Sequence, residues 1–148
     1  MSKILGSELT RELVNLLNSK GVTVVLATIS GDNYPNTTPV HLITAPNEKK
    51  VRMALGKMHQ SYMNIKANEN VMINILESND TAISIKGNAR IIKDPMEGNK
   101  NMAMVEVEVL EIKSDTTPTL IVTDGIKTKH RTAKTPEFFR LMFDELNS

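Results

Sequence analysis

The sequence predicts a mainly β domain in which an antiparallel sheet closes into a barrel and is flanked by helices. Three observations support this fold class: apolar runs with the composition of strands recur along the chain, short polar turns join them, and only three segments show helical spacing. Strands joined by short turns pair antiparallel, and a barrel protects the edges of roughly six or seven strands. We expect the 148 residues to form one domain over 1–148.

The first half of the chain is expected to begin with a helix over about 7–20, where leucines recur at helical spacing. Ser7 suits the N-cap of this helix, and Gly21 suits its C-terminal stop. Turns that contain Gly, Asn and Pro then separate three apolar runs. These runs predict strands at 22–30, 37–45 and 50–55.

The second half is expected to hold a helix at about 60–67 and a last helix at about 136–146, which Pro136 opens. A bend or bulge is expected near Gly87, and a break with a short helical turn is expected after Pro95. Apolar residues alternate in the segments between the two helices. They predict strands at 71–76, 81–92 and 102–113, with a weaker candidate at 119–123.

The composition argues against several classes of protein. A net charge of +1 gives no general attraction to nucleic acid or to anionic membranes, and an aromatic content of 3% offers few platforms for stacking bases. The N-terminus does not read as a signal peptide, and no stretch approaches the roughly 20 apolar residues that span a bilayer. The absence of cysteine excludes thiol chemistry and fits a reducing compartment. From all these observations together, we expect a cytoplasmic protein without nucleic-acid or membrane partners.

The segment from Met53 to Val71 is the most informative part of the chain. It reads as a strand that ends at Gly56, a short polar loop, a helix and the start of another strand. The loop brings Lys57, His59, Gln60 and Ser61 to the N-terminus of the helix, where free N–H groups favour an anion such as phosphate. The simpler alternative is an ordinary helix entry, because Ser is common near N-caps.

Other polar residues have simpler explanations than catalysis. His41 reads as a wall or interface residue, and His130 lies in the basic segment 127–134, which reads as solvated or as an arm that binds a phosphate or a second subunit. Glu106 and Glu108 lie at i, i+2, and an exposed sheet face explains them better than a catalytic carboxylate pair. The histidines lack metal-ligand spacing, and no nucleotide-binding or nucleophile motif is present, so no metal site is expected.

Several short motifs occur together in a recognisable order. They are Val24-Val-Leu-Ala-Thr-Ile-Ser, Pro35-x-x-x-Pro39-Val40, Gly56-Lys-Met-His-Gln-Ser and Asn64-Ile65-x-x-Asn68-x-x-Val71. In this order they resemble the pyridoxamine 5′-phosphate oxidase-like superfamily of FMN-binding split barrels. The loop is especially similar to that of small bacterial FMN-binding proteins, which read Gly-Gly-Met-His-Lys-Thr. The resemblance covers roughly residues 8–92.

The resemblance implies a six-stranded Greek-key split barrel that forms a homodimer, with FMN at the subunit interface. It implies that Gln60 and Ser61 hold the flavin phosphate, with Met58 and His59 as neighbours in the loop. Residues beside the isoalloxazine ring and along its other edge are implied to be Thr37, Thr38, Pro39, Val40, His41, Ala54 and Leu55.

The chain departs from the family pattern at the phosphate. Family members commonly place Lys or Arg where this chain has Gln60 or Ser61 and Thr38, and Lys57 is the nearest cation that could substitute. The leading hypothesis is an FMN-dependent oxidoreductase or electron-transfer protein, whose catalytic residues the motifs do not identify. The alternative is a split barrel without flavin that binds another phosphorylated ligand, a deazaflavin or a tetrapyrrole.

Overall fold

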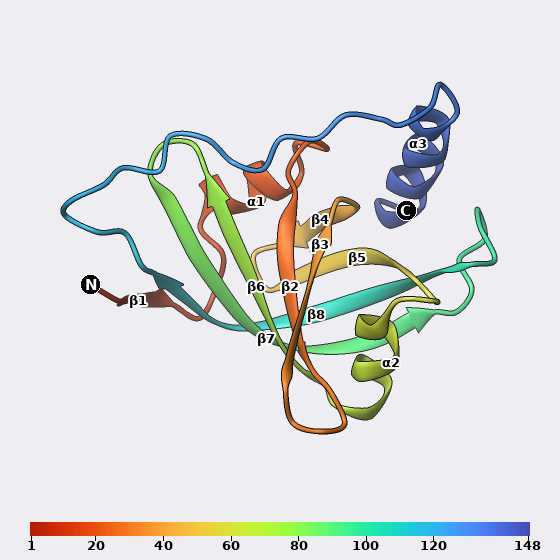
Figure 1. The fold of residues 1–148 in the computed structure, drawn as a ribbon, viewed down its shortest axis with the longest axis horizontal. Helices are drawn as coiled ribbons and strands as arrows, with labels where there is room; N and C mark the ends of the chain where they lie inside the picture. Colours follow the sequence, from red (N-terminus) through yellow and green to blue (C-terminus); the bar gives the residue numbers. More distant parts are fainter.

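The computed structural model describes residues 1–148, which form eight strands and three helices (Figure 1). The elements in chain order are β1 (Lys3–Gly6), α1 (Arg11–Leu17), β2 (Val24–Ile29), β3 (Pro35–Val40), β4 (Ile43–Asn47), β5 (Lys50–Gly56), α2 (Gln60–Ala67), β6 (Asn70–Glu77), β7 (Thr81–Lys93), β8 (Met102–Ser114) and α3 (Thr135–Leu146). None of the helices combines the length and apolarity needed to span a bilayer.

All eight strands belong to one antiparallel sheet, in the order β3-β2-β6-β7-β8-β5-β4, and β1 pairs with the end of β8. The two edge strands, β3 and β4, are consecutive in the chain, so His41 and Leu42 cross from one edge of the sheet to the other. The sheet is therefore curled but not closed. The predicted class, a mainly β split barrel with flanking helices, is confirmed, with eight strands in place of six.

The main hydrophobic core fills the inside of this sheet, and α1 packs over it. Period-two alternation produces it: Val24 and Leu26 of β2 are fully buried, while Val25 and Ala27 between them are half-buried. A bulge interrupts the pairing of β7 with β8 at Gly87, as expected. A Cβ there would lie 2.4 Å from a methyl group of Val107, so only glycine allows the two strands to approach this closely.

A second, smaller hydrophobic cluster lies on the opposite face of β5 and β8, under α3. Ala54 and Met104 point away from the barrel interior and pack against Met142, Phe143 and Leu146 of α3. The chain reaches α3 by a long extended segment after β8, which crosses the top of the view in Figure 1. This cluster attaches the C-terminal helix to the barrel.

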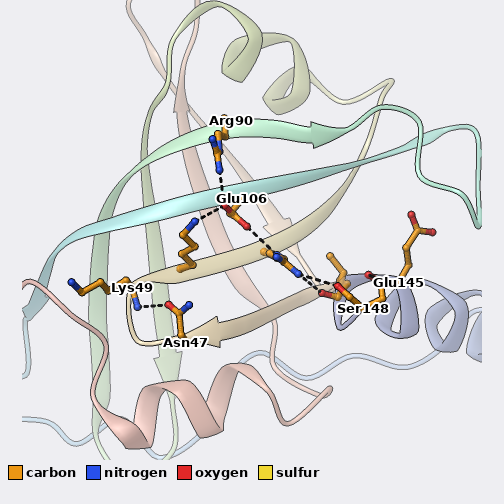
Figure 2. Close-up of polar contacts among 9 residues, drawn as sticks. Asn47, Lys49, Arg90, Glu106, Glu145 and Ser148 are labelled. Carbon is orange, nitrogen blue, oxygen red and sulfur yellow. Dashed lines mark hydrogen bonds and ion pairs between the residues drawn. The ribbon is translucent and has the colours of Figure 1, made fainter.

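Glu106 lies on the same outer face of β8, and its environment corrects the expectation of an exposed carboxylate. It is only 5% exposed and sits in register between Arg52 on β5 and Arg90 on β7. Lys50, Arg52 and Arg90 each donate a hydrogen bond of 3.1 Å to its carboxylate (Figure 2). Burial acts to raise the pKa of Glu106, but these three cations outweigh it and lower the pKa to about 2.

Four further expectations differ from the structure. Helix α1 begins at Arg11, with Thr10 as its N-cap, because the Leu9 N–H donates to the Glu48 carbonyl and holds the preceding residues outside the helix. The expected strand 37–45 is two strands, divided where the chain crosses between the sheet edges. The candidate strand 119–123 is not a strand, since Val122 bonds only to the turn residue Asp80. The break after β7 contains an isolated bridge rather than a helical turn.

Candidate functional site

A cavity of about 250 Å³ lies where the chain crosses between β3 and β4. Its walls come from the ends of β3 and β5, the loop before α2, the start of β8, and α3. The 13 residues that line it are Thr38, Pro39, Val40, His41, Leu42, Ala54, Leu55, Gly56, His59, Ser61, Met102, Phe138 and Phe139. Most of the residues that the sequence nominated therefore surround one cavity. Thr37, Lys57, Met58 and Gln60 lie outside it.

The N-terminus of α2 opens onto this cavity with no internal partner for its donors. The N–H groups of Gln60, Ser61 and Tyr62 donate to no other group of the protein. The N-cap residue, His59, makes no side-chain capping bond, and the first turn of the helix has no acidic residue. Unpaired N–H groups at a helix N-terminus carry partial positive charge, so this position suits an anion.

Ser61 adds a second kind of unpartnered polar group at this position. Its side chain is 1% exposed and lines the cavity, yet its hydroxyl has no hydrogen-bond partner. A buried hydroxyl without a partner costs about 1–3 kcal/mol, and such groups are rare in native structures. An acceptor bound in the cavity would satisfy this hydroxyl.

Asn64 holds α2 against the barrel, a role that the sequence reasoning missed. Its buried side-chain amide donates to Thr28 Oγ1 at 3.0 Å and to Ser30 Oγ at 3.3 Å, both at the end of β2. Its Oδ1 accepts a hydrogen bond of 2.8 Å from Gln60 Nε2, so the Gln60 side chain is engaged along the helix. Asn68 is the C-cap residue of α2, and its N–H donates to the Asn64 carbonyl.

The loop before α2 is fixed by two close contacts. The His59 ring lies over Gly56, where a Cβ would come 2.7 Å from His59 Cδ2, so glycine makes room for the ring. Lys57 points to Asp94, with Nζ 2.6 Å from Oδ1, and the Tyr62 hydroxyl donates to the same carboxylate. Hydrogen bonds from Lys57 and Tyr62 lower the pKa of Asp94, and the bond to Asp94 raises the pKa of Lys57. Lys57 thus anchors the loop to the end of β7.

His41 contributes a polar group to the opposite wall. Its Nδ1 lies 2.9 Å from Thr23 Oγ1, and its Nε2 has no partner in the protein. Burial lowers the pKa of the His41 imidazole and so favours its uncharged form. The side chain is half-buried and lines the cavity, as expected of a wall residue.

The C-terminal helix supplies two aromatic residues that the sequence reasoning did not assign to the site. Phe138 and Phe139 line the cavity, with ring centroids 6.0 Å apart. All three phenylalanines of the chain lie in this helix, which was the available signal, but helical periodicity does not tell which strands a helix will meet. No group of three or more His, Asp or Glu side chains is placed to hold a metal ion. The cavity thus combines an apolar, partly aromatic wall with the polar groups of Ser61, His41 and His59.

Comparisons with known proteins agree with the split-barrel fold. A family model for pyridoxamine 5′-phosphate oxidase matches residues 9–121. A Lactobacillus delbrueckii protein assigned as a pyridoxamine 5′-phosphate oxidase is 24% identical, with a TM-score of 0.63 over 76% of this chain and 98% of that chain. No curated protein sequence matches this chain significantly.

Two further solved structures share the fold and carry different names. An FMN-binding protein from Syntrophomonas wolfei is 14% identical, with a TM-score of 0.54 over 69% of this chain and 85% of that chain. The haem storage protein HutZ from Vibrio cholerae is 10% identical, with a TM-score of 0.54 over 70% of this chain and 95% of that chain. At these identities the similarity establishes the fold alone.

Proposed function

Because this chain belongs to the pyridoxamine 5′-phosphate oxidase family, we propose that it binds FMN in the cavity between β3, β5 and α2. We propose further that it acts as an oxidoreductase or electron-transfer protein. The observation that supports the proposal best is the buried, unpartnered hydroxyl of Ser61 beside the free N–H groups of α2. These neutral donors fit a phosphate group, which amides and hydroxyls bind at helix N-termini.

We propose that the remaining walls contact the rest of the cofactor. Pro39, Val40 and His41 would lie beside the isoalloxazine ring, and Ala54 and Leu55 would lie along its edge. When bound, FMN supplies electron or hydride transfer, and the protein supplies position and electrostatics. The role of the protein would then be to bind the phosphate through Ser61 and to exclude water from the cavity with its apolar walls.

We propose that the working form is a homodimer in the cytoplasm, in which a second copy completes the cofactor site. Pockets that enclose a whole drug-sized ligand usually have volumes of about 300–1,000 Å³, and the cavity of about 250 Å³ in one chain falls below this range. Thr37, Met58 and Gln60, which the sequence nominated, are exposed near the cavity and are available to a second copy. Sedimentation velocity with and without FMN tests the assembly, and a monomer in both conditions would contradict it.

The direct test of cofactor binding is a titration of FMN with the purified chain. The proposal predicts quenching of FMN fluorescence that saturates at one FMN per chain, with riboflavin binding more weakly because it lacks the phosphate. Unchanged fluorescence across the titration rules out the FMN site. Equal affinity for FMN and riboflavin moves the phosphate away from α2.

The second candidate is haem or a deazaflavin in the same cavity. The lack of a cation at the anion position weakens the case for FMN. His41 and His59 both line the cavity with imidazoles, which are common haem ligands, and this favours haem. A thermal-shift screen of FMN, FAD, deazaflavin and haem separates the candidates, because a ligand that binds the native state raises its stability. The largest shift identifies the occupant.

A further inference from the structure

The C-terminal part of the chain builds one wall of the cavity although it lies outside the family match. The match ends at residue 121, whereas Phe138 and Phe139 lie on α3. The Lactobacillus delbrueckii structure is covered over 98% of its length but matches only 76% of this chain. The aromatic wall therefore lies outside the region that the family model matches.

Helix α3 holds this wall in a fixed position. Met142 and Leu146 are fully buried beneath the helix. The Glu145 carboxylate accepts hydrogen bonds of 2.8 Å from the N–H groups of Glu97 and Gly98. Phe138 and Phe139 are only partly buried, so part of each ring remains available to a ligand in the cavity.

A basic segment lies beside the same wall. The His130 ring packs edge-on against Phe139, with ring centroids 5.0 Å apart. Lys129, Arg131 and Lys134 are exposed and form no ion pair. In contrast, the acidic groups Glu137 and Asp144 of α3 are both bound by Arg140. The segment therefore carries uncompensated positive charge at the edge of the aromatic wall.

We propose that residues 129–139 form the site of a second ligand, a molecule with a flat apolar ring system and an anionic group. The ring system packs against Phe138 and Phe139, and Lys129, Arg131 and Lys134 attract the anionic group. This site adjoins the cavity of the proposed cofactor along the aromatic wall and uses a different anion-binding element from α2. A molecule of this class would bind beside the cofactor. The evidence for the site is the aromatic wall and the basic segment, so the site does not depend on the cofactor being FMN.

Two probes of equal shape and different charge test the site: 2-naphthoate and its uncharged amide, 2-naphthamide. Binding to the full chain is measured by isothermal titration calorimetry, with and without FMN. The triple variant K129Q/R131Q/K134Q should bind naphthoate about five- to tenfold more weakly, because each exposed charge contributes a modest attraction, and should bind naphthamide as the wild type does. The difference should shrink from 0.1 M to 1 M salt, as the Debye length falls from about 10 Å to about 3 Å.

A matched control removes the same charge elsewhere. The variant K3Q/R11Q/K20Q changes exposed cations on β1 and around α1 that form no ion pair, and it should leave both probes within about twofold of the wild type. The conservative variant F138L keeps an apolar side chain in the second cluster but removes the ring, so it should weaken both probes about equally. Circular dichroism verifies that each variant is folded.

The outcomes separate this proposal from the proposed function. It is overturned if the wild type binds neither probe, if the triple variant binds naphthoate normally, or if the triple variant loses FMN while retaining riboflavin. The last result would assign the basic segment to the cofactor phosphate. If the wild type does not bind FMN but the charge dependence for naphthoate holds, the FMN proposal fails and the second site stands.

Discussion

Glu106 on β8 and Ser61 on α2 are both buried polar residues. Glu106 is 5% exposed and Ser61 is 1% exposed. The Glu106 carboxylate accepts hydrogen bonds from three cations, and one of them, Arg52, also donates to the Leu146 and Ser148 carbonyls (Figure 2). The Ser61 hydroxyl has no partner at all.

Under the proposed function, this difference distinguishes a structural polar group, Glu106, from a ligand-binding one, Ser61. A buried charge that is fully paired costs little to keep, and losing one partner is strongly destabilising. A buried hydroxyl without a partner costs stability, so replacing it should not harm the fold. We therefore expect changes at Glu106 to affect folding and not binding, and changes at Ser61 to affect binding and not folding.

The largest expected effect is that of Glu106→Gln on stability. The substitution should lower the free energy of unfolding by about 2–3 kcal/mol, at the low end for a broken buried pair because Lys50 and Arg90 reach solvent. Urea denaturation measures it, and FMN affinity should stay unchanged. The control Glu108→Gln, at an exposed position of the same strand, should change stability by less than about 0.5 kcal/mol. If Glu106→Gln weakened FMN binding and left stability unchanged, Glu106 would be a binding residue and not a structural one.

The second effect is the acid sensitivity that Glu106 confers. Its pKa is lowered from 4.5 to about 2 in the folded state, so its contribution is complete above pH 4.5 and is lost as the pH falls through 2. About 2 kcal/mol of it should be lost between pH 7 and pH 3. Urea denaturation of wild type and Glu106→Gln at both pH values should show their stabilities converging in acid. A constant difference would mean that the carboxylate does not carry the effect.

The third effect concerns Ser61, the buried residue without a partner. Ser61→Ala should weaken FMN about tenfold, or about 1.4 kcal/mol, and riboflavin by less than about twofold, because the lost hydroxyl serves only the phosphate. Unfolding should show no loss of stability. Thr44→Val is the control, since the Thr44 hydroxyl is also buried without a partner but does not line the cavity. If Ser61→Ala destabilises the protein while FMN binds normally, Ser61 is a packing residue.

The smallest expected effect is that of Gly56→Ala on FMN affinity, which tests whether the shape of the loop before α2 matters for binding. The new Cβ would lie 2.7 Å from His59 Cδ2, so the ring must move. We expect FMN affinity to fall about three- to fivefold, or about 0.6–1 kcal/mol, with little loss of stability because His59 is exposed. Gly31→Ala, where nothing lies within 4 Å of the new Cβ, should leave fluorescence titrations unchanged. An equal effect at both glycines would exclude the His59 contact as the cause.

Local patterns predicted the elements that depend on neighbours in the sequence. The bounds of α2 follow from the residues that favour a helix between two strand-forming runs. The bulge at Gly87 follows from a glycine within a strand of alternating apolar residues. The loop before α2 was identified in the same way, and it does open onto the cavity. That the chain forms a single domain stays a prediction, which one cooperative unfolding transition would test.

Features that depend on distant pairing were missed. Strand β1 pairs with the end of β8, more than a hundred residues away, and nothing in Lys3–Gly6 reveals its partner. Glu106 looked exposed because alternation shows which face a residue takes and not what covers that face; here Arg52 and Arg90 flank it from two other strands. Phe138 was missed for a similar reason, because only the packing of α3 against the barrel brings it to the cavity.

The two hydrophobic clusters have no residue in common: one fills the barrel, and the other fastens α3 to its outside. In evolutionary terms, this separation makes the C-terminal wall a replaceable part. Mutations beneath α3 can reshape one side of the cavity while the barrel keeps its own packing. A lineage that kept the barrel and the α2 loop could thus change what enters the cavity by altering the last helix alone.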